Sequence, residues 1–180
     1  MLTHRLATHA DIPALRALMA LAIDRLQIGF LDERTIAASR AIMGLDTQLI
    51  TDGTYFVIEA DGALAGCGGW SRRATLFGGN HAAARDDTLL DPACEPARVR
   101  AMYTHPAFVR RGVGRLVLQL AEAAARSGGF GSAELAATLA GVPLYTACGW
   151  SVIEPLRSDP IDGQCVPLVR MGKLLVSSPA

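Results

Sequence analysis

The sequence predicts a single domain of the mixed α/β class. Strand-like and helix-like hydrophobic patterns alternate along its 180 residues, which is typical of domains that pack helices against a sheet. A chain of this length can bury one sizeable core, and no linker-like segment interrupts it. We therefore expect residues 1–180 to form one domain.

The N-terminal part is expected to contain one short strand and two helices. Residues 3–6 have a strand pattern, and a helix follows to about Leu26. Asp11-Ile12-Pro13 is expected to cap this helix, because proline is well tolerated in a first helical turn. A second helix is expected from about Asp32 to Met43. The apolar residues expected on one face of the first helix are Ile12, Leu15, Leu18, Met19 and Ala22.

A hairpin and a long irregular segment occupy the middle of the chain. Strands are expected at residues 54–59 and 63–67, because Asp61-Gly62 between them is a strong hairpin-turn signal. Residues 71–96, rich in Ala, Gly, Asp and Pro, form a longer connection than compact domains usually have. Long loops often carry function, so we expect this segment near the mouth of a substrate site, with a plain surface insertion as the alternative.

The most informative stretch joins a strand to a helix. Residues 99–104 have a strand pattern that Pro106 ends, since proline has no N–H for a ladder bond. The run Val109-Arg110-Arg111-Gly112-Val113-Gly114-Arg115 follows and leads into a helix. The apolar stripe expected on that helix is Leu116, Leu120 and Ala123, widened by Val117.

This loop has the features of an anion site. Gly112 and Gly114 allow successive backbone N–H groups to point into one concavity at a helix N-terminus, where phosphate oxygens bind. Three arginines in the same run add positive charge. The nucleoside-triphosphate loop spacing is absent, and Val117 stands where the dinucleotide motif needs a third glycine. The loop therefore favours another pyrophosphate-bearing ligand, with an ordinary solvated helix start as the alternative.

A second group of residues follows this helix. A short helix is expected from about Gly141 to Cys148, and Gly149 is expected to end it in the left-handed conformation. Trp150 is expected in the core, where it opens another strand over residues 151–153. A last strand is expected at residues 166–171.

The order of these features resembles the GCN5-related N-acetyltransferase superfamily. That family has a loop of the form Gln/Arg-x-x-Gly-x-Gly/Ala and a late helix of the form Tyr-x-x-x-Gly-Phe, which match Val109–Gly114 and Tyr145–Trp150 here. His105-Pro106 before the loop and the last strand are also similar to the family. The resemblance covers most of the chain. It implies a mostly antiparallel central sheet, splayed between the fourth and fifth strands, with helices on both faces.

Two positions depart from the family's pattern. Val109 replaces the usual Gln or Arg, which removes a polar side chain but no backbone N–H. Thr138 stands where many members have Asn, seven residues before the Tyr, and its hydroxyl has less reach. The cofactor site is therefore expected to be weakened rather than lost.

The resemblance also implies an activity, the transfer of an acetyl group from acetyl-coenzyme A to a primary amine on a small molecule or a peptide. In the family the amine attacks directly, the fourth strand pairs with the pantetheine arm, and loop amides hold the pyrophosphate. Tyr145 matches the general acid that protonates the departing thiolate. The cofactor-binding positions carried over are Met102, Tyr103, Thr104, Arg110, Arg111, Gly112, Val113, Gly114, Arg115 and Thr138.

Two alternative functions stay open at this point. A non-catalytic acyl-coenzyme A binding or sensing module would use the same loop, with Tyr145 as a core residue whose hydroxyl bonds the backbone. An interaction domain that binds no nucleotide is the third alternative. The general base is not singled out either, since its candidates by residue type are Glu59, His81, His105, Glu134 and Glu154.

The strand end over residues 66–73 is a candidate acceptor site. Glycines there permit close backbone approach, and Trp70 would wall a pocket. Arg72, with Arg73, would attract a carboxylate on the acceptor. The alternative is a bulged strand end with a core tryptophan and two surface arginines.

Composition excludes several other classes of protein. The net charge is 0, which gives no case for binding nucleic acid or an anionic membrane. No metal site or disulfide framework is expected, because the 4 cysteines and 4 histidines are scattered, and the cysteines are expected as small buried hydrophobes. Residues 135–153 are uncharged for long enough to suggest a membrane span, but glycine, proline and changes of period favour a buried strand–helix–strand unit.

The N-terminal residues lack the apolar run of a signal peptide, so a cytoplasmic protein is expected. The late strands are a candidate surface for a homodimer. The sequence specifies neither the acceptor amine nor the length of the acyl chain.

Overall fold

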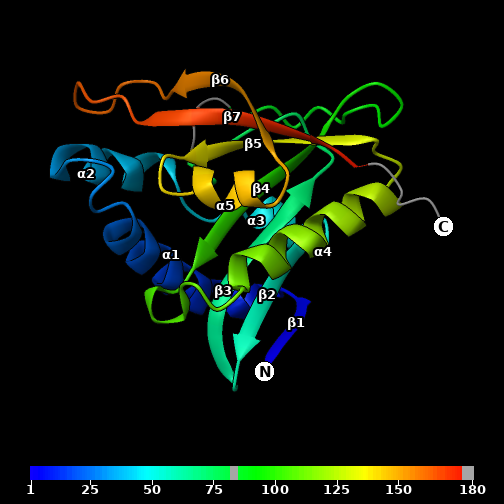
Figure 1. The fold of residues 1–180 in the computed structure, drawn as a ribbon, viewed down its shortest axis with the longest axis horizontal. Helices are drawn as coiled ribbons and strands as arrows, with labels where there is room; N and C mark the ends of the chain where they lie inside the picture. Colours follow the sequence, from blue (N-terminus) through cyan, green and yellow to red (C-terminus); the bar gives the residue numbers. More distant parts are fainter. Residues whose placement is uncertain (82–84, 176–180) are drawn as a thin grey trace.

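The computed structural model describes residues 1–81 and 85–175. These residues form a seven-stranded sheet with helices on both faces (Figure 1). Its strands are β1 (Leu2–Leu6), β2 (Tyr55–Ala60), β3 (Ala63–Ser71), β4 (Ala97–Thr104), β5 (Ser132–Thr138), β6 (Ser151–Arg157) and β7 (Pro167–Leu174). They lie in the order β1-β2-β3-β4-β5-β7-β6, and every neighbouring pair is antiparallel except β4 and β5. The mixed, mostly antiparallel sheet predicted from the sequence is confirmed.

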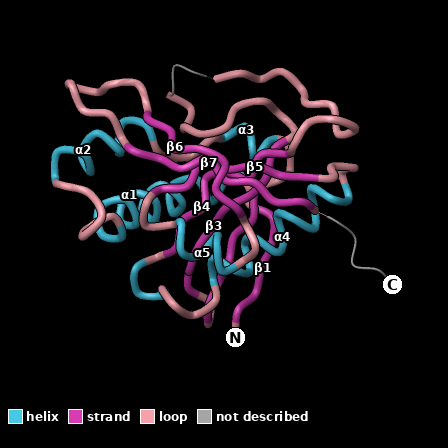
Figure 2. Tube along the Cα trace, turned by 45° about the horizontal axis from the view of Figure 1, so that its top comes forward, coloured by secondary structure: helices cyan, strands magenta, loops and turns pink. Residues whose placement is uncertain are grey.

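The helices of the described ranges flank this sheet, with α1 and α2 on one side and α4 on the other (Figure 2). They are the 3-10 turns η1 (His9–Asp11) and η2 (Pro106–Phe108) and the α-helices α1 (Ile12–Leu26), α2 (Glu33–Ile42), α3 (Thr47–Thr51), α4 (Val113–Ser127) and α5 (Val142–Ala147). The helices α1 and α2 lie within one residue of their predicted bounds. The sequence analysis missed α3, because a helix this short shows no periodic pattern.

The β2–β3 hairpin closes as the sequence predicts. Asp61 and Gly62 have φ angles of 52° and 82°, the positive values that a two-residue hairpin turn requires. β3 continues to Ser71, beyond the predicted end at Cys67, and pairs with both neighbours over its glycine-rich part. Glycines lower strand propensity, so local sequence underestimates a strand that its neighbours hold on both sides.

The glycines of β3 allow α4 to lie close to the sheet. A side chain at Gly66 would overlap Val113, and a Cβ at Gly68 would lie 2.6 Å from Cγ1 of Val117. Val113 and Val117 are buried here against residues of β2 and β3. These glycines therefore serve helix packing rather than the approach of a ligand.

The buried face of α4 differs from the predicted stripe. Leu116 and Leu120 are only partly buried, and Ala123 is exposed. The predicted stripe lies on the flank of the face that is actually buried. The two faces differ because α4 packs against two regions at once, the β3 glycines and the core near β5. The hydrophobic residues that α4 buries are Val113, Val117, Leu118, Ala121 and Ala125.

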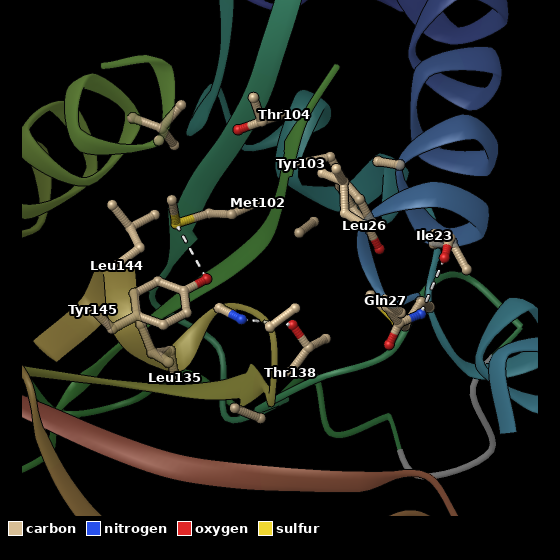
Figure 3. Close-up of a pocket in the computed structure, with 18 of the residues that line it drawn as sticks. Ile23, Leu26, Gln27, Met102, Tyr103, Thr104, Leu135, Thr138, Leu144 and Tyr145 are labelled. Atoms are coloured by element: carbon tan, nitrogen blue, oxygen red, sulfur yellow. Dashed lines mark hydrogen bonds between the residues drawn. The ribbon is translucent and has the colours of Figure 1, made fainter. Parts of the chain in front are cut away.

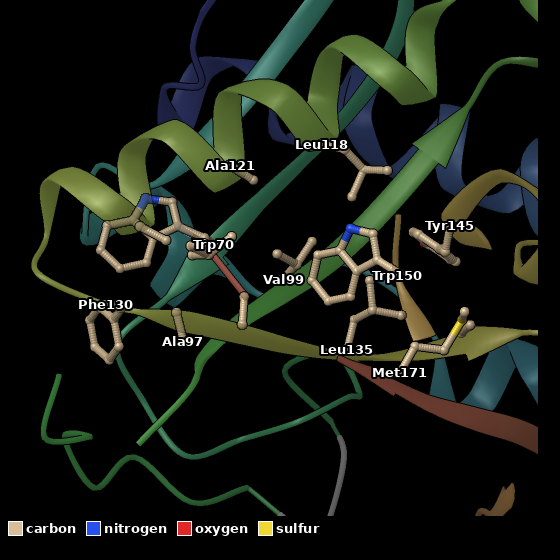
Figure 4. Close-up of a cluster of buried hydrophobic side chains, with 14 of the residues drawn as sticks. Trp70, Ala97, Val99, Leu118, Ala121, Phe130, Leu135, Tyr145, Trp150 and Met171 are labelled. Atoms are coloured by element: carbon tan, nitrogen blue, oxygen red, sulfur yellow. The ribbon is translucent and has the colours of Figure 1, made fainter. Parts of the chain in front are cut away.

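The main core lies between α4, β5 and β7, and it contains both tryptophans (Figure 4). Trp150 is 2% exposed, and its indole Nε1 donates a hydrogen bond to Oε1 of Glu122 at 2.9 Å. Trp70 packs edge-on against Phe130, with ring centroids 5.9 Å apart. The predicted core position of Trp150 is confirmed. On the opposite face, α1 and α3 bury a second cluster with Tyr55 and Val57 of β2.

Two local predictions need correction. Asp11 stands at the N-cap of α1 but makes no side-chain cap bond; its carboxylate accepts hydrogen bonds from Arg5 and Thr8, and the Arg5 guanidinium holds the pKa of that carboxyl below its usual range. The cysteines are all free but not all buried, since Cys94 is exposed and only Cys67 is fully enclosed.

Residues 135–153 belong to the predicted strand–helix–strand unit, made here of β5, α5 and β6. In the ranges that the structure covers, no helix combines the length and the hydropathy needed to cross a membrane. The same ranges contain no group of three or more His, Cys, Asp or Glu side chains placed to hold a metal ion.

Candidate active site

β4 and β5 separate soon after they pair. Their ladder holds only at Ala97–Ala133 and Arg98–Glu134, so the predicted splay between the fourth and fifth strands is confirmed. Ala101 has a φ of 51°, and the β3–β4 register shifts opposite it, so β4 carries a bulge. The edge of β4 that faces β5 is therefore left without a strand partner over residues 99–104.

A cavity of about 700 Å³ lies at this gap, within the size range of small-molecule sites. One wall, the α4 side, comes from β4, the loop before α4, the end of β5 and α5. The opposite wall, the α1 side, comes from α1, the end of α2, the β3–β4 connection and β7. The two walls enclose one continuous space.

The predicted β4 residues Met102, Tyr103 and Thr104 all line the cavity. Figure 3 shows Met102 turned toward Tyr145 and Tyr103 turned toward α1. The Tyr103 hydroxyl accepts a hydrogen bond from the Gly44 amide at 3.0 Å, which ties β4 to the end of α2. β4 thus contributes to both walls.

The loop before α4 has the conformation of an anion nest. Arg110 and Gly112 have φ angles of 63° and 86°, and these left-handed residues turn the chain into α4. The first hydrogen bond of the helix runs from Leu116 N–H to the Gly112 carbonyl. The amides of residues 113–115 therefore have no partner within the helix, and no side chain caps them. Nothing in the described ranges lies within 4 Å of a Cβ built at Gly112, so there is open space beside this residue.

The three arginines of the loop do not act together. Arg110 and Arg115 line the cavity, as do Val109, Gly112, Val113 and Gly114. Arg111 does not, because its guanidinium lies 5.1 Å from the centroid of the Phe108 ring and 3.9 Å from a carboxylate oxygen of Asp61. Arg111, a predicted cofactor-binding residue, therefore does not line the cavity.

Thr138 ends β5 at the cavity wall. Its hydroxyl accepts a hydrogen bond from the Gly141 amide at 3.2 Å, next to the start of α5. The hydroxyl oxygen is thus partly occupied in positioning α5, which holds Tyr145.

Tyr145 lies on α5 with its ring packed edge-on against Trp150, at a centroid distance of 6.4 Å. Its hydroxyl points into the cavity and lies 3.8 Å from the sulfur of Met102 (Figure 3). Burial raises the pKa of Tyr145 to about 12, so the hydroxyl stays protonated at neutral pH. The structure therefore presents a neutral hydrogen-bond donor beside the open edge of β4.

The α1 side was missed by the sequence analysis. It is formed by apolar side chains from four separate segments, and Gln27 and Arg100 are polar exceptions. No short motif marks such a wall, because its residues share only their hydrophobicity. The apolar residues are Ala22, Ile23, Leu26, Phe30, Ile42, Met43, Leu76, Phe77, Val166 and Leu168. Two of them come from the irregular segment 71–96, which was expected near a site mouth.

None of the five candidate bases lines the cavity. Glu59 pairs with Arg5 at 3.2 Å, and Glu134 pairs with Arg98 and Arg170 at 2.6 and 2.7 Å. The others lie elsewhere: Glu154 pairs with Arg170, His105 accepts a bond from the Ala107 amide through Nδ1, and His81 is exposed. Among the described residues, no Asp, Glu or His side chain reaches the cavity wall.

Trp70 and Arg72, the predicted acceptor residues, also lie outside the cavity. Trp70 is 5% exposed in the main core, and Arg72 is an exposed side chain whose guanidinium lies 5.8 Å from the Trp70 ring. The structure therefore favours the alternative, a core tryptophan with a surface arginine. Arg73 pairs with Asp52 instead of facing a ligand.

A buried ion pair supports the α1 side. Arg100 of β4 bonds Asp46 at 2.6 Å, and the two side chains are 3% and 1% exposed. Arg100 also donates to the Gly78 carbonyl at 2.6 Å, and Arg85 bonds the second oxygen of Asp46 at 3.0 Å. These bonds fix the long β3–β4 connection to β4 and to the start of α3.

Comparisons of this chain with known proteins agree with this geometry. A model of the acetyltransferase (GNAT) family matches residues 19–150. No curated protein sequence matches the chain.

Several solved structures share the fold. A GCN5-related N-acetyltransferase from Rhodopseudomonas palustris has a TM-score of 0.69 at 16% identity, covering 96% of this chain and 94% of that one. YncA, a putative acetyltransferase from Salmonella typhimurium with acetyl-coenzyme A, has a TM-score of 0.63 at 20% identity, covering 100% and 97%. The PaiA N-acetyltransferase from Thermoplasma acidophilum, in complex with coenzyme A, has a TM-score of 0.63 at 14% identity, covering 97% and 99%.

The family match extends from α1 to Trp150, so it includes the splayed strands, the loop before α4 and the helix that holds Tyr145. It spans well over half of the sequence. This chain belongs to the acetyltransferase (GNAT) family.

Proposed function

We propose that this protein is an N-acetyltransferase that moves the acetyl group of acetyl-coenzyme A to a primary amine by direct attack. The observation that best supports this function is the continuity of the cavity. Unpartnered amides and the open β4 edge line one wall, and an apolar compartment faces them across the same space. Acetyl-coenzyme A and the amine can therefore occupy the same cavity and react inside it.

The α4 side has the donors that acetyl-coenzyme A requires. The amides of Val113, Gly114 and Arg115 would hold its pyrophosphate oxygens, with Arg110 and Arg115 side chains adding charge. The open edge of β4 would pair with the pantetheine arm as an added strand. Open space beside Gly112, directly before these amides, is consistent with such a site.

Acetyl transfer needs the amine nitrogen and the thioester carbon held within reach of each other. This positioning alone removes several kcal/mol of barrier. The C–N bond forms as the neutral amine attacks, and the nitrogen then releases its surplus proton to water. The C–S bond breaks, and the sulfur leaves as a thiolate. Backbone N–H groups on the open edge of β4 would stabilise the oxyanion of the transition state.

Tyr145 would act as the general acid at the sulfur. Its pKa of about 12 keeps the hydroxyl protonated, so a donor is always present at neutral pH. An ordinary thiol has a pKa of about 8.5, so complete transfer to a free thiolate would be uphill. The hydroxyl would therefore stabilise the charge that develops on the sulfur by donating a hydrogen bond as the C–S bond breaks, and a tyrosinate formed by proton transfer would regain its proton from water.

The amine must lose its proton before it attacks. Because no carboxylate or imidazole of the described residues lines the cavity, we propose that the proton passes to water and the amine enters in its neutral form. Activity should then rise with pH toward the pKa of the amine.

A non-catalytic acyl-coenzyme A module is the second candidate. Val109 and Thr138 favour it, because Val109 lacks a polar side chain and the Thr138 hydroxyl already accepts a hydrogen bond from the Gly141 amide.

A cytoplasmic location and a homodimer through the late strands remain predictions.

The first test is calorimetric titration with acetyl-coenzyme A, with NADH and ATP as controls. Saturable and selective binding that is lost in Gly112→Val supports the coenzyme site. Gly131→Ala is a matched control, since nothing lies within 4 Å of its Cβ position and its backbone needs no left-handed conformation. Turnover of Tyr145→Phe then separates the two candidates, because a large loss with intact coenzyme affinity supports catalysis and no change supports the module.

A further inference from the structure

Gly141 stands directly before α5, at a position where the backbone does not require glycine. Its φ and ψ angles are −82° and −26°, a helical conformation that any residue adopts. In that conformation glycine is less favourable than alanine, because it loses more conformational freedom on folding. A glycine at such a position indicates that another group needs the space of the missing side chain.

The group that occupies this space is the ring of Tyr145. A helical side chain leans back toward the start of its helix, so residue 145 lies over residue 141. A Cβ built at Gly141 would lie 2.8 Å from Cε2 of the ring, whereas ordinary van der Waals contacts begin at 3.4 Å. The ring therefore rests directly on the backbone of Gly141.

The start of α5 is fixed to the end of β5. The Gly141 amide donates to the Thr138 carbonyl at 2.9 Å and to the Thr138 hydroxyl at 3.2 Å. The Gly141 carbonyl accepts hydrogen bonds from the Leu144 and Tyr145 amides, at 3.0 and 3.2 Å. Gly141 therefore cannot retreat from the ring without weakening these bonds.

The end of α5 is fixed as well. Nζ of Lys173 donates to the Cys148 carbonyl at 2.8 Å and to Oε2 of Glu122 at 2.7 Å. The other oxygen of this carboxylate accepts from the Trp150 indole, and Trp150 packs edge-on against the ring of Tyr145, which opposes rotation of the ring in place (Figure 4). Because both ends of the helix are held, a side chain added at its start would tilt the ring instead of moving the helix.

Taking the proposed acetyltransferase function as given, we propose that Gly141 is a positioning residue, which holds the Tyr145 hydroxyl at the open edge of β4. That hydroxyl lies 3.8 Å from the sulfur of Met102 on this strand. Moving the ring edge from 2.8 to 3.4 Å displaces it by about 0.6 Å, and the hydroxyl moves further because it lies farther from the Cα about which the ring tilts. A misplacement of about 1 Å can cost about 100-fold in rate.

A double-mutant cycle tests this role. We would follow release of coenzyme A with phenethylamine, phenylalaninamide, lysinamide and spermidine as probe acceptors, and use the fastest of them. Gly141→Ala should lower kcat about tenfold or more, while the Kd for acetyl-coenzyme A changes less than about twofold. In the Tyr145→Phe background the same substitution should have no further effect on kcat, because the hydroxyl that it displaces is already absent. An unchanged kcat, or equal losses in the two backgrounds, would overturn the proposal.

Gly131→Ala is the matched control. No atom of the described residues lies within 4 Å of a Cβ built at Gly131, and this glycine does not line the cavity. Its kcat and coenzyme affinity should equal those of the wild type. Urea denaturation of both variants checks that each is folded, and we expect no loss of stability at Gly131.

A second measurement follows the ring without turnover. The chain has 3 tyrosines, so NMR of tyrosine labelled with carbon-13 at Cζ gives three signals, of which Tyr145→Phe identifies one. We expect Gly141→Ala to move the Tyr145 signal and to leave those of Tyr55 and Tyr103 in place. A Tyr145 signal that does not move would overturn the proposal, whatever the rate shows.

The proposed function and this inference fail in different ways. Absence of turnover in the wild-type protein, or an unchanged kcat in Tyr145→Phe, contradicts the proposed mechanism, while the tyrosine signal still decides whether Gly141 fixes the ring. Turnover that falls in Tyr145→Phe but not in Gly141→Ala contradicts this inference alone and leaves the proposed function standing.

Discussion

The two walls of the cavity are built from different parts of the polypeptide. The α4 side uses mainly backbone, the unpaired edge of β4 and the free amides at the start of α4. The α1 side uses side chains from segments far apart in the sequence, held in place by the Arg100–Asp46 pair. Backbone donors suit a ligand that stays the same, such as the coenzyme. Side chains can be substituted one at a time, so they suit an acceptor that differs from one protein to another. The first wall is thus fixed by fold, and the second by the identity of each residue.

The largest expected effect comes from breaking the ion pair that supports the α1 side. Asp46→Ala leaves Arg100 buried without its carboxylate, and we expect the free energy of unfolding to fall by about 3–5 kcal/mol. Urea denaturation at pH 7 measures this change. Asp24→Ala is the control, because its pair with Arg40 is exposed and pairs of that kind contribute about 0–1 kcal/mol. Equal losses in the two variants would contradict the supporting role of Asp46.

The next effect concerns Tyr145, the donor that we propose at the leaving sulfur. Tyr145→Phe should lower kcat by about 100-fold or more, while the Kd for acetyl-coenzyme A changes little. Because burial raises the pKa of Tyr145 to about 12, the acid form is lost only as pH rises through that value. The wild-type enzyme should therefore show no alkaline decline in kcat up to about pH 10, as stopped assays across pH 6–10 would record. A decline with an apparent pKa near 8 would mean that another group supplies the proton.

A smaller effect is expected from the backbone of the α4 side. Gly112→Val places a branched side chain at a φ of 86°, where only glycine fits without strain. We expect coenzyme affinity to fall about tenfold or more, because the amides after residue 112 lose their common direction. Calorimetry measures the affinity, and amine binding to the α1 side should be preserved. Loss of both affinities together would show that the two walls do not act independently.

The smallest effect concerns the Arg73–Asp52 pair, which ties the β3–β4 connection to the end of α3. The Arg73 guanidinium lowers the pKa of the Asp52 carboxyl below 3.8, so the pair stabilises the folded protein above that pH and loses its effect as the pH falls through the depressed folded-state value. Asp52→Asn should cost about 0.5–1 kcal/mol at pH 7, with a difference from wild type that shrinks below pH 4. Denaturation series at pH 7 and pH 3 would check the sign, and a constant difference would contradict it.

The contrast between the two walls also explains what the sequence could predict. Gly112, Gly149 and Asp61-Gly62 mark positions where the backbone itself requires a residue type, so the loop, the end of α5 and the hairpin were found correctly. Asp46 and Arg100 carry no such mark, since their pairing depends on which distant residues the fold brings together. The prediction that the glycines of β3 admit a ligand is wrong for Gly66 and Gly68, because local sequence does not show that α4 lies against them.

The open edge of β4 has one further consequence. A sheet interrupted at its centre leaves the free protein without part of its hydrogen-bond complement, and an added strand from the ligand would supply it. A ligand that binds only the folded chain raises stability by mass action, by about 2.7 kcal/mol at a hundredfold excess over its Kd. Resistance of this protein to heat and proteolysis would then follow the concentration of coenzyme A around it. Its turnover in the cell would report the supply of the coenzyme.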